Sequence, residues 1–174
     1  MNLPVPPDYV IWVAFALANA VALGLLTASI RRPLLARFLL ALLFAGASVY
    51  NAYTVLTSPW VYTDFADYAV LDVYRWFILG PFERIARPLI GLIAAGQAVI
   101  ALAMGLTGQP FRWGCLAGLL FCGGILPLGI GAAFPMPLLL GAGFYQLYRH
   151  PADHLLWKRP VHRRRRKLAL QPHA

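Results

Sequence analysis

The stretch GLLTASIRRPLLARFLL, residues 24–40, joins two long apolar runs, 9–30 and 34–56, through an Arg-Arg-Pro turn. Each run is long enough for a helix that crosses about 30 Å of hydrocarbon, which takes about 20 residues. Proline is compatible with the first turn of a helix, so Pro33 can begin the second run. The stretch therefore predicts a tight antiparallel hairpin of two transmembrane helices.

The composition excludes a soluble domain. Hydrophobic residues make up 60% of the chain and charged residues 12%, and the mean hydropathy is +0.67. Soluble domains have about 45–50% apolar and about 25% charged residues. We therefore predict an integral membrane protein with an all-α fold, a polytopic helical bundle of about five spans with one interfacial amphipathic helix on the outer side.

Further spans are predicted at 88–106, 112–127 and 130–148. The last two divide one apolar stretch, 114–148, which contains three prolines and could instead cross the membrane once. Two crossings are favoured because they put most Arg and Lys residues on the cytoplasmic side. Residues 1–148 then form a single transmembrane domain.

The net charge of +9 comes largely from the end of the chain, because eight of the fifteen Lys and Arg residues follow Tyr148. A basic cluster after a final span indicates the cytoplasmic side and attracts anionic lipid headgroups. We predict a multi-pass protein of the cell inner (plasma) membrane, with its amino terminus outside and residues 149–174 as a flexible cytoplasmic tail. Nucleic-acid binding is not predicted, because the sequence shows no basic face with interleaved aromatic residues. The predicted headgroup ligands are Arg163, Arg164, Arg165, Arg166 and Lys167.

The segment SPWVYTDFADYAVLDVYRWFI, residues 58–78, holds three of the six acidic residues. At 100° per residue its apolar and polar side chains separate, which predicts an amphipathic helix over 63–78 lying in the membrane plane. Its acidic face can be solvated, can contact a protein partner or can bind a hard cation. The polar face and the segment after it supply candidate ligand contacts at Asp64, Asp67, Arg75, Arg84 and Arg87.

Charged residues next to the spans have simple interpretations. Arg37 is expected to extend its long stem to the membrane interface, with an ion pair as the alternative. Glu83 and Arg87 have the spacing of an ion pair on a helix. Arg84 and Arg87 could instead hold a lipid phosphate or a carboxylate.

The spans lack Asp and Glu from 9 to 63 and from 88 to 148. An ion-coupled pump is therefore disfavoured, because it needs intramembrane ionisable groups. Asn51 and Gln97 can bridge helices by hydrogen bonds. Alternatively, Asn51, Tyr53 and Gln97 could orient the polar head of a lipid or quinone beneath the lid helix.

Small residues predict surfaces for close helix packing at Ala14, Ala18, Ala22, Gly114 and Gly118. They could pack against a larger membrane protein or a second copy. Cys115 and Cys122 share one helical face about 10 Å apart, too far for a disulfide, and are interpreted as packing residues.

No catalytic residue and no metal site are predicted. The chain has no HExxH, no GxSxG and no phosphate-binding glycine loop. His150, Asp153 and His154 lie close together in sequence, but a metal site would need more ligands.

Four segments together resemble the DoxX-like family of small bacterial membrane proteins: YNAYTVLTSP, YTDFADYAVLDVYRWFI, PLIGLIAAGQAVIALAMGL and CLAGLLFCGGILPLGIG. The resemblance covers residues 34–148 and leaves 9–30 as an extra helix. It implies a helical bundle with a polar outer segment, and a setting near membrane redox complexes. Members commonly have a glutamate near the position of Gln97, so a charge-dependent activity is not implied for this chain.

The leading hypothesis is a non-catalytic accessory or assembly subunit of a larger membrane complex. The alternative is a transporter or membrane enzyme that binds a lipid or quinone in a pocket under the lid helix. A third, based on the tail alone, is a polybasic adaptor at the membrane surface.

Overall fold

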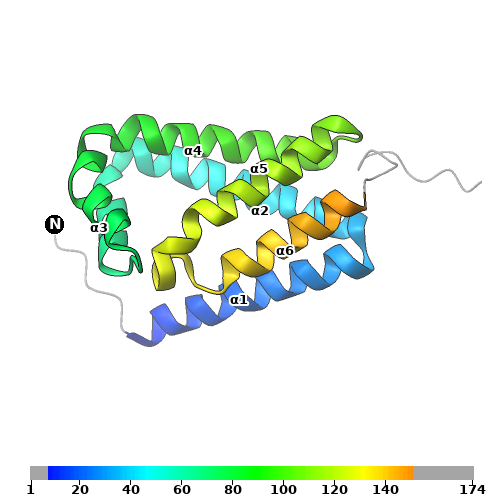
Figure 1. Cartoon of the computed structure of the whole chain (residues 1–174), viewed down its shortest axis with the longest axis horizontal. Helices are drawn as coiled ribbons and strands as arrows, with labels where there is room; N and C mark the ends of the chain where they lie inside the picture. Colours follow the sequence, from blue (N-terminus) through cyan, green and yellow to red (C-terminus); the bar gives the residue numbers. More distant parts are fainter. Residues whose placement is uncertain (1–7, 151–174) are drawn as a thin grey trace, which may run out of the picture.

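The structure, a computed structural model, describes residues 8–150 and is a bundle of helices (Figure 1). Within that range no strand occurs, so the predicted all-α fold is confirmed. The long helices are α1 (Asp8–Arg31), α2 (Pro33–Thr57), α4 (Pro81–Gly105), α5 (Gln109–Ile125) and α6 (Met136–Arg149). Short helices connect them: η1 (Pro59–Asp67), α3 (Asp72–Leu79) and η2 (Leu126–Ala132).

The first two helices form a hairpin in which a single residue, Arg32, separates α1 from α2. Pro33 occupies the first turn of α2, where its missing N–H costs no helix hydrogen bond. From this turn the helices run side by side and then diverge, with α6 lying along α1 and α4 lying along α2 (Figure 1). The hairpin therefore forms one end of the bundle.

Within residues 8–150, four segments are long and apolar enough to cross a membrane: α1, α2, α4 and the segment Gln109–Ala132, which combines α5 and η2. The chain is accordingly a multi-pass membrane protein by length and composition. Helix α6 has 14 residues, about 21 Å at a rise of about 1.5 Å per residue. It is shorter than the hydrocarbon core of about 30 Å.

The segment predicted as one amphipathic helix over 63–78 is instead two short helices, η1 and α3, so that prediction was wrong. The break has a tertiary cause. The Val70 N–H, which a continuous helix would use internally, donates to Pro127 O of η2 at 2.9 Å. We refer to residues 59–79, which contain η1 and α3, as the lid.

Helix α4 begins at Pro81, seven residues before its predicted start at Pro88, which lies inside the helix. Pro81 occupies the first turn, and Pro88 removes one N–H from the helix ladder. The last spans also differ in their bounds, because η2 and a bend at Ala133 separate α5 from α6.

Arg37 lies inside the bundle with 0% of its surface exposed, so the prediction that it reaches the interface was wrong. Its Nε donates to Met104 O at 3.0 Å and its Nη2 donates to Leu106 O. Its guanidinium lies 4.6 Å from the centre of the Phe111 ring. The last carbonyls of a helix have no partner within the helix, and a cation there is favourable. Arg37 therefore ties α2 to the end of α4.

Aromatic rings fill the centre of the bundle. Phe44 of α2 packs edge-to-face on Phe121 and Phe144, with ring centres 5.5 Å and 5.4 Å away. Such pairs contribute about 0.5–1.5 kcal/mol beyond the buried area. A Cβ added to Gly118 would lie 2.6 Å from the Phe144 ring, so glycine is needed for α5 to approach α6.

Candidate ligand cavity

An apolar space of about 470 Å³, here called the inner cavity, lies among α1, α2, α5 and α6, beside the aromatic cluster that contains Phe44 and Phe121. Aliphatic and aromatic side chains line it, including Phe44, Phe121 and Leu140. Among the described residues that line it, only Gln97 of α4 is polar. A concave apolar site with one or a few polar groups is typical of small-molecule sites, whose volumes are about 300–1,000 Å³.

Gln97 is 3% exposed, and its side chain belongs to a chain of hydrogen bonds that begins on the lid. The Tyr62 hydroxyl of η1 donates to Asn51 Oδ1 of α2. Asn51 Nδ2 in turn donates to Gln97 Oε1 at 2.7 Å. In residues 8–150 no group accepts a hydrogen bond from Gln97 Nε2, so a residue that lines the inner cavity has an NH₂ group without a partner there.

The same helix pair is joined one turn away, where Ser48 Oγ donates to Ala94 O at 2.7 Å. Two interhelical hydrogen bonds therefore hold α2 against α4 at the level of the cavity. In membranes such bonds contribute about 0.6–2 kcal/mol each. Gln97 is thus held at a defined position in the cavity wall.

Burial raises the pKa of the Tyr62 phenol above its ordinary value. A phenol with a raised pKa keeps its proton throughout the physiological pH range. Tyr62 therefore remains a hydrogen-bond donor to Asn51 under those conditions.

The inner cavity opens sideways between α1 and α2. Leu17 and Val21 of α1 line the cavity yet are 62% and 46% exposed. Leu43 of α2, which also lines it, is 38% exposed. In a membrane this face of the bundle meets lipid tails, so an apolar molecule can enter without passing through water.

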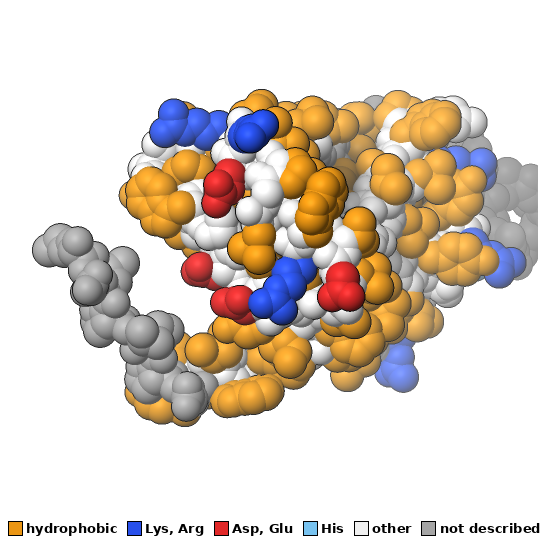
Figure 2. Space-filling model, turned by 60° about the vertical axis from the view of Figure 1, so that its left-hand side comes forward, with side chains coloured by type: hydrophobic (Ala, Val, Ile, Leu, Met, Phe, Trp, Pro, Cys, Tyr) orange, Lys and Arg blue, Asp and Glu red, His pale blue; other side chains and the backbone are white. Residues whose placement is uncertain are grey.

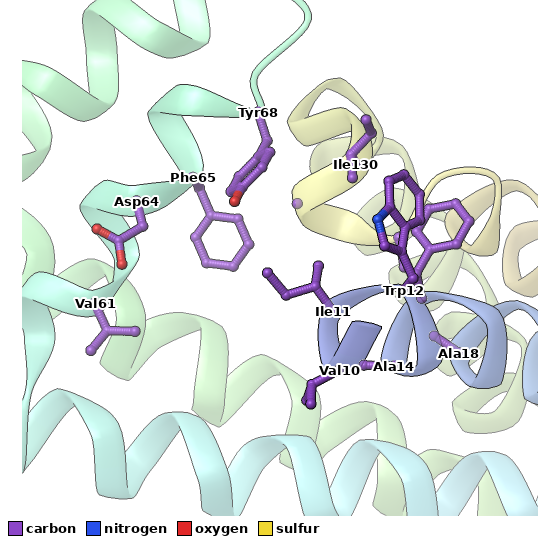
Figure 3. Close-up of a pocket in the computed structure, with 13 residues that line it drawn as sticks. Val10, Ile11, Trp12, Ala14, Ala18, Val61, Asp64, Phe65, Tyr68 and Ile130 are labelled. Atoms are coloured by element: carbon purple, nitrogen blue, oxygen red, sulfur yellow. The ribbon is translucent and has the colours of Figure 1, made fainter. Parts of the chain in front are cut away.

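A second space of about 750 Å³, the lid pocket, lies between the start of α1 and the segments η1 and η2. Figure 3 shows Phe65 and Tyr68 of the lid on one side and Ile11 and Trp12 of α1 on the other. Ala14 and Ala18 line both the lid pocket and the inner cavity. The two spaces therefore adjoin along α1.

Asn19 connects α1 to the chain after η2. Its Nδ2 donates to Phe15 O and to Ala133 O, both at 3.0 Å. Ala133 has a left-handed backbone, with φ of 52°, and leads into α6. This bond fixes the position of α1 beside the lid pocket.

The predicted ligand-contact residues do not form one site. Asn51 and Gln97 meet through a hydrogen bond, whereas Tyr53 is 66% exposed on the outside of α2 and lies apart from them. Asp64 lines the lid pocket. The remaining four are exposed on the lid or the start of α4: Asp67, Arg75, Arg84 and Arg87.

Charged side chains gather on the lid end of the molecule (Figure 2). In the part of the chain that the structure describes, no ion pair forms within 4.0 Å. Glu83 and Arg87 are both exposed, and the pair that their spacing suggested is absent. The predicted headgroup residues of the tail, 163–167, lie outside the described residues, as do Asp153 and His154.

The predicted packing residues lie against other parts of the same chain or line the cavities. A Cβ added to Gly114 would lie 2.4 Å from Ala103 Cβ of α4, and Gly118 makes its close approach to Phe144. Ala22 is buried in the core. Ala14 and Ala18 instead line both cavities, and their small side chains leave that space unfilled.

Sequence reasoning missed Tyr62 and the burial of Arg37. Tyr62 could have been singled out, because it is a polar residue of the lid only eleven positions after Asn51. The sequence does not show, however, which way the lid folds over the helices. Among residues 8–150 no group of three or more His, Cys, Asp or Glu could hold a metal ion. The arrangement is suited to binding the polar head of an apolar molecule through one amide.

No family model, no curated protein and no solved structure matches this chain. The resemblance to the DoxX-like family remains a prediction.

Proposed function

We propose that this multi-pass membrane protein binds an apolar molecule of the lipid or quinone class in the inner cavity beneath its lid. The observation that carries the proposal is the Nε2 group of Gln97, a donor without a protein partner in residues 8–150 on a side chain only 3% exposed. An unpaired polar group in apolar surroundings is costly. A ligand with a polar head would remove that cost.

The shape of the site supports the same proposal. The polar head would lie at Gln97 and the apolar remainder would occupy the space along Ala14 and Ala18 toward the lid pocket. The opening between α1 and α2 would admit such a molecule directly from the bilayer. With no ionisable side chain on the inner cavity wall among the described residues, binding or transport fits better than catalysis.

The proposed orientation has five crossings of a bacterial inner membrane, with the lid outside and the tail in the cytoplasm. In its support, the Arg31–Arg32 turn, Arg112 and the end of α6 lie at the end of the bundle opposite the lid (Figure 1). The positive-inside rule favours the cytoplasm for that end.

A second proposal is an accessory or assembly role in a larger membrane complex, with DoxX-like proteins as the model. The charged side chains of the lid favour it, because they are exposed and form no ion pair within residues 8–150, which leaves them available to a protein partner. In that case the lid would be the docking surface.

Native mass spectrometry of the full chain, extracted from its own membrane into lipid nanodiscs, tests both proposals. A bound lipid or quinone is expected on the wild type and on Gln146→Leu, a matched control in α6. The ligand should be lost from Gln97→Leu and Asn51→Leu. Equal retention by all four proteins would overturn the cavity proposal. A reproducible protein partner without a small ligand would support the accessory role instead.

A further inference from the structure

We infer that the inner cavity selects molecules whose head carries a hydrogen-bond acceptor, such as a carbonyl oxygen, because Tyr62 of the lid sets the direction of both amides. The inference rests on the proposed function and specifies the chemistry of its ligand. It assigns Tyr62 as a specificity-determining residue that need not touch the ligand.

The direction follows from the donors and acceptors along the chain. A carboxamide has an oxygen that accepts and an NH₂ group that donates, and a half-turn of the side chain exchanges them. The Tyr62 O–H donates to Asn51 Oδ1, and with its oxygen held there Asn51 turns its Nδ2 toward α4. Asn51 Nδ2 donates to Gln97 Oε1 at 2.7 Å. Gln97 is then left with Nε2 for the cavity.

A donor at the wall of an apolar cavity distinguishes three heads of equal size. A carbonyl oxygen accepts from Gln97 Nε2 and leaves no polar group unpaired. A hydroxyl can accept as well, but its own O–H must then share Gln97 Oε1, the only side-chain acceptor among the described lining residues, with Asn51 Nδ2. A methylene leaves Nε2 unpaired, and unpaired polar groups cost most where the dielectric is low.

The selectivity therefore depends on the lid. Removing the Tyr62 hydroxyl would free Asn51 to turn, after which Gln97 could present either its oxygen or its NH₂ group. Tyr74 offers a matched control, since its hydroxyl also connects the lid to the bundle, donating to Gly124 O at 2.9 Å, but is not part of the amide chain.

The test uses three probes with one skeleton: decyl phenyl ketone, the corresponding secondary alcohol and undecylbenzene. Each competes for the full chain in nanodiscs, with bound amounts read by native mass spectrometry. The ketone carries ¹³C at its carbonyl, whose resonance moves downfield on hydrogen bonding. We expect the ketone to bind about 5-fold more tightly than either competitor, within the range of one hydrogen bond, with a downfield shift that Gln97→Leu abolishes.

In Tyr62→Phe, the preference for ketone over alcohol should fall to about twofold or less, from the loss of one orienting hydrogen bond, while Tyr74→Phe keeps it. An equal fall in both variants would overturn the directional role of Tyr62. Equal binding of all three probes to the wild type, without a carbonyl shift, would overturn the inference and leave the proposed function intact. Failure of every probe to bind would count against the proposed function itself.

Discussion

Replacing Arg37 by Lys is expected to destabilise the bundle strongly although it conserves the charge. Lys cannot reproduce the planar fork that reaches Met104 O and Leu106 O together. Loss of one charge-assisted hydrogen bond costs about 1.5–3 kcal/mol. Loss of the stacking on Phe111, at 4.6 Å, costs about 0.5–2 kcal/mol. The cost of burying a charge remains in both proteins, so the free energy of unfolding should fall by about 2–5 kcal/mol.

The difference in the free energy of unfolding can be measured by steric trapping of the protein during reversible unfolding in bicelles. Arg31→Lys is the control, because Arg31 is exposed at the same end of the bundle and its replacement should change stability by less than about 0.5 kcal/mol. If Arg37→Lys also stayed within about 0.5 kcal/mol of the wild type, the carbonyls at the end of α4 would not depend on the guanidinium. The reasoning about Arg37 would then be refuted.

Three other predictions concern packing, the lid and pH. Gly118→Ala should lower the free energy of unfolding by about 1–3 kcal/mol, because the added Cβ would lie 2.6 Å from the Phe144 ring. Gly123→Ala is the control: its Cβ would meet nothing within 4 Å, so it should be neutral or stabilising in the same assay. Gly129→Ala should lower the free energy of opening of the lid by about 1–3 kcal/mol, since Gly129 has φ of 60° and no room for a Cβ. Hydrogen exchange of η1 and α3 should speed up in this variant, and unchanged exchange would contradict the prediction. Burial raises the pKa of Tyr62. The contribution of Tyr62 to the stability of the lid should therefore be complete below the pKa of a free phenol, about 10, and be lost as pH rises through the higher pKa of the folded protein. Hydrogen exchange of the lid should speed up across that alkaline range in the wild type but show no such step in Tyr62→Phe.

The class of the protein and its hairpin could be predicted from the sequence because they depend on local quantities. The length of an apolar run decides whether a helix can cross a membrane, and Arg31, Arg32 and Pro33 mark the turn without reference to any other segment. Asn51 and Gln97 could be singled out in the same way, because polar side chains inside spans are few and costly to leave unpaired. Because an unpaired polar side chain is costly there, the two amides pair with each other through a hydrogen bond.

Only the tertiary structure decided the fate of Arg37, the break in the lid and the role of Tyr62. Arg37 is buried because the open carbonyls at the end of α4, 67 or more residues away in sequence, lie within its reach. The lid breaks because Pro127 O takes the Val70 N–H from a helix that periodicity alone would continue. These outcomes depend on which groups from distant segments meet, whereas the apolar pattern of each segment specifies only that it forms a helix and enters the membrane.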